Sequence, residues 1–196
     1  MKKPKLSAKQ LLSVLLVFLI LVTSAPITFS VSVVDSGTCG NNLTWILDSN
    51  GLLTINGKGA MWDYDDWNSS NRSPFCKRRD IITLEIGDKV TYIGNYAFDT
   101  CMNLETVSIP NSVTKIGDYA FFGCGLRSMV IPKSIKEIGR QSVSECHELN
   151  DLTVACETIG TYAFSGCPLK NLTIEEGVKT IRSFAFARFA FGDTEG

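Results

Sequence analysis

The stretch LEIGDKVTYIGNYAFDTCMNL, residues 84–104, is followed by a second version of itself. That version, VSIPNSVTKIGDYAFFGCGL, covers residues 107–126. Three further versions begin at Met129, Leu152 and Leu172. Repetition at this period is typical of a solenoid, in which one unit cannot bury its apolar face alone and stacked units share a continuous core.

Three columns of equivalent residues set the period. Successive members lie 21 to 23 residues apart, which predicts about five repeats of 20–23 residues. In the fifth unit Arg182 takes the place of the column glycine. The columns consist of small residues (Ala97, Ala120, Ser142, Ala163, Ala185), cysteines (Cys101, Cys124, Cys146, Cys167) and glycines (Gly94, Gly117, Gly139, Gly160).

Each unit begins with a pattern that predicts a short strand. Val107 and Ile109 alternate with Ser108, as expected for a strand with one buried face. Pro110 ends that strand, because proline cannot donate a hydrogen bond to a ladder. A second apolar pair follows, and the column glycine is then expected to turn the chain.

The Tyr-Ala-Phe segment after the column glycine is expected to form a single helical or 3-10 turn. Its phenylalanine is expected to fill the core, and Val143 takes that place in the third unit. The core phenylalanines are Phe98, Phe121, Phe164 and Phe186. The whole pattern therefore predicts a β-rich solenoid with short helical turns.

Residues 33–80 lack the repeat and are expected to form an N-terminal cap region. Two strands, Thr44–Leu47 and Leu52–Ile55, flank a turn at Asp48–Gly51 and predict a β-hairpin. A solenoid needs such a cap because its core is otherwise exposed at each end. The repeat array covers residues 81–191.

The C-terminal end carries no matching cap signal. A tail, residues 192–196, follows the array, and Phe189 and Phe191 have no sixth unit to cover them. Exposed strand edges and apolar side chains favour association. We therefore expect either self-association through the fifth repeat or fraying there.

Residues 1–32 have the order of a secretory signal peptide. Lysines at positions 2–9 precede an unbroken apolar run, Leu11–Val22, and small residues follow it. The cleavage point is open between residues 25 and 32, and an uncleaved N-terminal anchor is the alternative. Without the four leader lysines the formal net charge falls from −1 to −5, which argues against nucleic acid as a partner.

The repeated unit I-P-x-S-V-x-x-I-G-x-x-A-F-x-x-C-x-x-L resembles the BspA-like (Treponema-type) leucine-rich repeat. The resemblance covers Ile81 to about Phe186, and Ser36–Met61 is similar to the leader that often precedes such arrays. It implies a leucine-rich-repeat solenoid in a secreted or cell-surface protein of bacteria or mucosal protists, associated with adhesion to host matrix proteins or other cells. The family has no shared catalytic residues, so the resemblance implies none here.

Seven cysteines in an exported chain raise the question of disulfides. The four column cysteines are expected to be small buried thiols, although stacked equivalents would lie within bridging distance. Among the remaining three, a Cys39–Cys76 disulfide that fixes the cap is the favoured pairing. No cofactor site is expected, and the absence of a C-x-x-C motif argues against zinc.

Catalytic and calcium sites are poorly supported by the sequence. His147 is the only histidine, and its neighbour Cys146 is expected to point the other way. Asp63, Asp65 and Asp66 lack the spacing of a calcium loop, so a polar cap loop is the better interpretation. No catalytic, cofactor or metal residues are therefore predicted.

The concave strand face is the predicted partner-binding surface. Short hydroxyl and amide side chains would form a flat, wettable face suited to an extended protein partner. The function predicted is a secreted or surface adhesion module; the alternatives are an exported enzyme or enzyme-associated domain, or a truncated family member without independent activity. The two outward columns are Thr83, Thr106, Ser128, Asp151 and Asn171, and Glu85, Ser108, Val130, Thr153 and Thr173.

Overall fold

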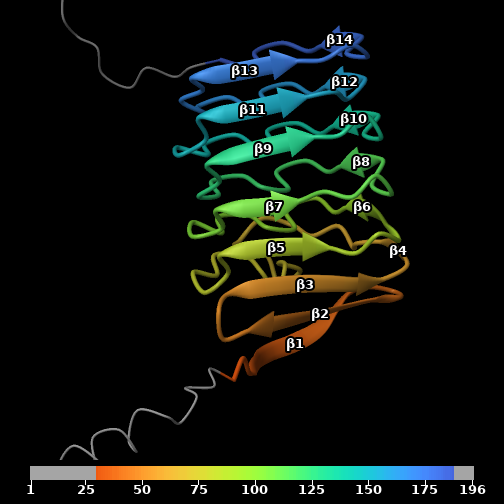
Figure 1. The fold of residues 1–196 in the computed structure, drawn as a ribbon, viewed down its shortest axis with the longest axis vertical. Coiled ribbons are helices and arrows are strands. Elements are labelled where there is room, and N and C mark those ends of the chain that lie inside the picture. The colour runs from red at the N-terminus through yellow and green to blue at the C-terminus, as the bar shows by residue number, and fades with distance from the viewer. Residues whose placement is uncertain (1–29, 188–196) are drawn as a thin grey trace, which may run out of the picture. The chain divides into compact units, whose positions relative to one another are not determined.

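A computed structural model describes residues 30–187 of the 196-residue chain, and Ser32 onward forms one compact unit (Figure 1). The expected signal segment up to residue 29 lies outside the described residues. The expected tail and the two phenylalanines before it do so as well. Among residues 30–187, no helix has the length and apolar character needed to cross a membrane.

The N-terminal region forms the predicted hairpin. Strand β2 (Leu43–Asp48) pairs antiparallel with β3 (Leu52–Gly57), and the additional strand β1 (Val33–Gly40) pairs with β2 on its other side. β3 then pairs in parallel with the first repeat strand, β5 (Thr83–Ile86). The hairpin therefore continues the sheet of the solenoid as its first rung and covers that end of the core.

Each repeat contributes one longer strand to a parallel array, whose outward surface we call the strand face. In β9 and β11 the side chains alternate between core and solvent, as the pattern predicts, because successive residues of a strand point to opposite sides. All four residues of the last strand of the array, Asn171–Ile174, are exposed. The ladder is interrupted once, between β7 and β9, which divides the array into two sheets. The strands after β5 are β7 (Thr106–Ser108), β9 (Ser128–Ile131), β11 (Asp151–Val154) and β13 (Asn171–Ile174).

A second side of the stack carries one further strand from each unit, of two residues except in β6 (Val90–Ile93). These strands form one uninterrupted parallel sheet of six strands. The second apolar position is buried in the first four repeats, as at Ile116 and Ile138, whereas Ile181 of the fifth is exposed. The strands are β4 (Gly59–Ala60), β6 (Val90–Ile93), β8 (Lys115–Ile116), β10 (Glu137–Ile138), β12 (Thr158–Ile159) and β14 (Thr180–Ile181).

The third side consists of turns, and the predicted helical turns are wrong. Among residues 30–187 no helix forms, because the first residue of the Tyr-Ala-Phe segment has a left-handed backbone: φ is 52° at Tyr96 and 56° at Tyr119. A right-handed helix requires negative φ. The backbone bonds the next rung instead: Tyr96 N donates to Asp118 O, and Phe98 N donates to Ala120 O.

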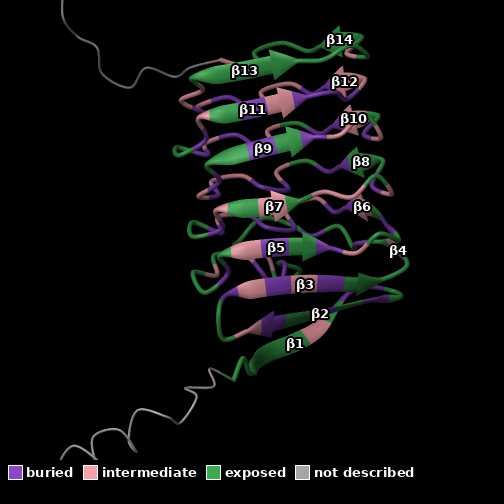
Figure 2. Cartoon of the chain, in the orientation of Figure 1, coloured by how far each residue is buried: buried purple, intermediate pink, exposed green. Residues whose placement is uncertain are grey.

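The core is a column of stacked rings between these three sides. Figure 2 shows buried residues in the inner rungs, whereas β13 and β14 of the last rung are exposed. The rings of Phe98 and Phe121 stack with centroids 5.1 Å apart, and Phe75 stacks on Phe98 at the same spacing. Val143 occupies this position in the third unit, as predicted, and is fully buried. Phe75 shows that the repeated core begins one unit earlier than the sequence indicated.

The column glycines do not turn the chain, contrary to expectation. None of the four has positive φ. They permit close approach instead: a Cβ at Gly94 would lie 1.9 Å from the carbonyl oxygen of Trp62, and one at Gly160 would lie 2.4 Å from that of Ile138. Glycine is required where two backbones come this near, because any side chain would overlap the neighbouring rung.

Candidate functional site

The structure places all ten predicted strand-face residues on one outward surface, in register within each of the two sheets of the array. Thr83 lies beside Thr106 and Glu85 beside Ser108, and the pairing continues from β9 through β11 to β13. Thr83 and Thr153 are half-buried, and the other eight are exposed. The predicted columns therefore exist as aligned surface features, with one break between β7 and β9.

Neighbouring side chains within these columns bond to one another. The Thr106 hydroxyl donates to Thr83 Oγ1 at 3.2 Å, and the Asn171 amide donates to Asp151 Oδ1 at 2.6 Å. Val130 is different, because it is apolar and 64% exposed at the middle of the face. Exposed apolar side chains of this kind become favourable contacts when a partner removes them from water.

A groove of about 300 Å³ opens on the strand face where the ladder is interrupted. Its walls come from β7 on one side and β9 on the other. Hydroxyl and apolar side chains both line it. The residues that line it are Thr106, Val107, Ser108, Ile109, Ser128, Met129, Val130 and Pro132.

The sequence did not reveal how far this surface extends or where it opens. β3 adds Leu52 beside Thr83 and Thr54 beside Glu85, so both columns continue onto the hairpin. The outward position of Thr54 in its alternating strand was a usable signal. The groove had no such signal, because strand pairing depends on three-dimensional register rather than on residue type.

The column cysteines are buried free thiols, as the favoured interpretation predicts. Each thiol donates to a carbonyl oxygen of the preceding rung at 3.0 to 3.2 Å, so the column acts as a set of internal hydrogen bonds. The donor and acceptor pairs are Cys101 with Phe75, Cys124 with Phe98, Cys146 with Phe121 and Cys167 with Val143.

The predicted Cys39–Cys76 disulfide is not formed in the structure, where both residues are free thiols. Cys39 is buried on β1, where burial raises its pKa to about 12. Cys76 contacts the buried carboxyl of Asp99 instead, with Sγ 3.8 Å from Oδ2. The two thiols have different neighbours because β1 joins the hairpin sheet, whereas Cys76 lies beside the turn of the first repeat.

Cys76 should react slowly with iodoacetamide at neutral pH. Burial, and then the Asp99 carboxyl, raise its pKa to about 11, so less of the reactive thiolate is present at a given pH. We expect the alkylation rate to rise about tenfold per pH unit until the pH approaches that value. Peptide mass mapping would measure it, with the fully buried Cys146 as a control that is labelled only after unfolding. Rapid labelling of Cys76 at pH 7 would contradict this assignment.

The acidic cap loop has a structural role that the sequence left open. Asp63 Oδ1 accepts a hydrogen bond from the backbone nitrogen of Asn95 at 2.8 Å and another from the Tyr92 hydroxyl at 2.7 Å. One rung later, Asn95 Oδ1 accepts the Asp118 amide in the same way. In the described part of the chain, no group of three or more histidine, cysteine or acidic residues is placed to hold a metal ion.

Cys146 and His147 point to opposite sides of their loop. The Cys146 thiol donates inward to Phe121 O, whereas the imidazole of His147 lies outside, with Nε2 3.5 Å from Glu145 Oε2. A thiol and an imidazole directed apart cannot exchange a proton, so these neighbours do not form a nucleophile–base pair.

Comparison with solved structures finds leucine-rich-repeat proteins. One from Eubacterium ventriosum is 22% identical, covers 78% of this chain and 63% of its own, and has a TM-score of 0.43. The T. pallidum leucine-rich-repeat protein is 24% identical over 64% and 65% of the two chains, with a TM-score of 0.45. Pneumococcal vaccine antigen PcpA is 17% identical over 80% and 48%, with a TM-score of 0.47.

This chain spans less than two thirds of the length of each of these three structures, and similarity at this level adds nothing about function. No curated protein matches the chain. The model of the BspA type leucine rich repeat region, by contrast, matches residues 69–190 in six copies. The copies start upstream of residue 81, in agreement with the place of Phe75 in the core column. The chain belongs to the BspA-type leucine-rich-repeat family.

Proposed function

We propose that this chain is a protein-binding module that holds its partner against the strand face. The observation that carries the proposal is the groove between β7 and β9, which opens within two columns of short polar side chains. Hydroxyl groups along a flat face supply many weak hydrogen bonds, and the groove beside Val130 supplies an apolar anchor point. Buried anchors of this kind contribute most of the affinity of a typical interface.

The module acts outside the cell as an adhesion surface, with host matrix proteins, cell-surface proteins or the surfaces of other microbial cells as partners. The signal-like order of residues 1–32 supports export. The opposite directions of Cys146 and His147 support a binding role rather than turnover.

A second copy of this chain is a further partner that we propose. The fifth repeat exposes large apolar side chains on both of its strands and on its turn. They are Leu172, Ile174, Ile181 and Phe184. Apolar surface grouped in this way is typical of association sites.

Replacing Val130 with glutamate should weaken partner binding about tenfold or more, because it puts a charge at the centre of the strand face beside the groove. Surface plasmon resonance against purified collagen, laminin, fibronectin and the chain itself would measure it. Val130 is 64% exposed, so the fold tolerates the change. The matched control is Thr91→Glu. Thr91 is exposed on β6, in the six-stranded sheet on another side of the stack.

Equal binding of both variants to every partner bound by the unaltered protein would place the interface elsewhere. Binding lost equally in both variants would indicate a fold defect, which the melting temperature of each variant would identify. Binding lost only in Val130→Glu supports the strand face.

A further inference from the structure

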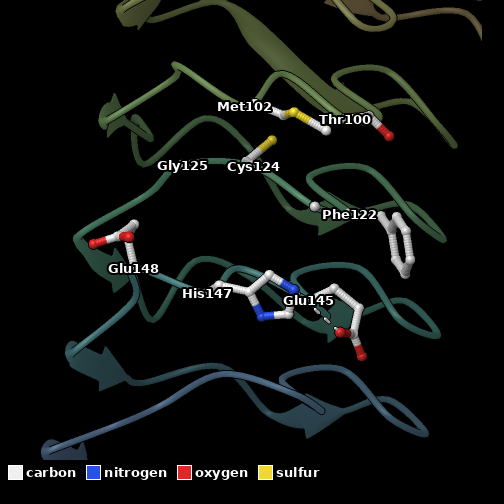
Figure 3. Close-up of a pocket in the computed structure, with 9 residues that line it drawn as sticks. Thr100, Met102, Phe122, Cys124, Gly125, Glu145, His147 and Glu148 are labelled. Atoms are coloured by element: carbon white, nitrogen blue, oxygen red, sulfur yellow. Dashed lines mark ion pairs between the residues drawn. The ribbon is translucent and has the colours of Figure 1, made fainter.

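A second hollow, of about 400 Å³, lies in the loops that precede β7, β9 and β11 (Figure 3). Thr100 and Met102 border it from one rung, and Glu145, His147 and Glu148 border it from the rung two units further on. The rung between them forms the floor. None of these residues belongs to the strand-face columns, so the hollow is a separate site.

The hollow exists because the middle loop carries little side chain. That loop reads G-C-G-L at residues 123–126, one residue shorter than the equivalent T-C-M-N-L at residues 100–104. Gly123 has φ of +64°, and a Cβ at Gly125 would lie 2.1 Å from the carbonyl oxygen of Met102. Cys124 points inward and donates to Phe98 O. Backbone atoms therefore form the floor of the hollow. A side chain at Gly125 could fill it only by displacing the preceding rung, which carries Met102.

The charge around the hollow is negative. Two carboxylates, Glu145 and Glu148, border it directly. The guanidinium of Arg79 is nearby but lies outside the lining, with Nη2 3.8 Å from Met102 Sδ, so the carboxylates outnumber it. Glu145 has the imidazole of His147 at 3.5 Å, which carries charge only when protonated. In residues 30–187, the Glu148 carboxylate has no ion pair or hydrogen bond. Figure 3 shows the two carboxylates on either side of the imidazole.

Apart from Thr100 and the two carboxylates with their histidine, the lining is apolar or backbone. The thioether of Met102 and the ring of Phe122 border the hollow together with the small loop residues. A ligand that fits this combination has a cationic end and an apolar stem. Arginine has both, and its planar guanidinium forms paired hydrogen bonds with a carboxylate and stacks on aromatic rings. Arginine is also enriched at the centre of protein interfaces.

We propose that this hollow binds an arginine side chain of a partner protein, with the guanidinium held by Glu145 and Glu148. The carboxylates supply the charge, and Met102 and Phe122 contact the stem. The site goes beyond the strand-face function because it requires neither Val130 nor the groove.

The test uses the peptide acetyl-Gly-Arg-Gly-amide and its citrulline counterpart, which has the same shape without the charge. Two-dimensional nuclear magnetic resonance of the isotope-labelled chain would follow the amides of Gly123, Gly125 and Glu145. The arginine peptide should cause saturable shifts there, with a dissociation constant on the order of 1 mM, and the citrulline peptide should cause none. Glu145→Gln and Glu148→Gln should each weaken binding about tenfold.

Two control variants distinguish binding in this hollow from binding elsewhere on the chain. Glu176→Gln removes an exposed carboxylate outside the hollow and should leave the shifts unchanged. Val130→Glu should also leave them unchanged, so this result is independent of the strand-face experiment. Equal shifts with citrulline, no shifts with arginine, or shifts that survive both glutamine substitutions would each overturn the proposal. The unaltered chain alone decides the first two outcomes, even where a variant fails to fold.

Discussion

Replacing Phe121 with alanine is expected to lower the free energy of unfolding by about 3–5 kcal/mol. The ring is fully buried and stacks on Phe98 at 5.1 Å with an interplanar angle of 13°. Backbone hydrogen bonds hold the turn to the next rung: Phe121 N donates to Ser142 O at 2.7 Å. The rungs therefore cannot close over the lost volume, and most of the cavity cost remains. Urea unfolding monitored by circular dichroism would measure the loss.

Tyr119→Ala is the matched control, two residues away in the same turn. Tyr119 is half-buried and stacks on Tyr96 with centroids 4.7 Å apart, so its removal should cost less than about 1.5 kcal/mol. Similar, small losses for both variants would show that the inward direction assigned to Phe121 is wrong.

Gly117→Ala is expected to destabilise the chain by roughly 3 kcal/mol, a large effect for one methyl group. The new Cβ would lie 2.6 Å from the backbone nitrogen of Asn95. That strain is relieved only if two rungs separate, and separation breaks the 2.9 Å hydrogen bond that Gly117 N donates to Ile93 O. Thermal unfolding followed by calorimetry would measure the change.

Gly87→Ala tests whether the effect comes from close approach or from glycine itself. At Gly87 the nearest atom to an added Cβ is the carbonyl oxygen of Ile55, at 3.0 Å, so a small shift accommodates it. We expect a loss of about 1 kcal/mol or less there. If both alanine variants were equally stable, the glycine column would not be required for rung spacing.

Much of this fold could be predicted from the sequence, because equivalent positions of the repeat are buried or exposed in the same way in successive units. Val107 and Phe121 are recognisable as core residues through their equivalents in other units. Stacking of the units then fixes which columns face solvent, so the positions of Ser108 and Val130 on the strand face followed directly.

Other features depend on contacts between rungs, which the type of a single residue does not indicate. Tyr96 is an ordinary residue for a helical turn, and its left-handed backbone is stabilised by hydrogen bonds to the next rung, which the sequence does not show. The interruption between β7 and β9 was equally hidden, because V-S-I and M-V-I are both good strand sequences. The hollow did leave a signal, since Gly123 and Gly125 flank Cys124 only in the second unit.

The interruption also has a mechanical consequence. At this level two sides of the stack stay bonded, through β8 with β10 and through the turns. On the strand side the ladder is interrupted, and the backbone hydrogen bond from Arg127 N to Glu105 O, just before the two strands, is what remains. Where two sides of a solenoid are hydrogen-bonded between rungs and the ladder of the third is interrupted, the stack bends most easily toward or away from the third side. Force applied along the stack would therefore concentrate strain at β7 and β9, and the groove proposed to hold the partner would widen or narrow with that force.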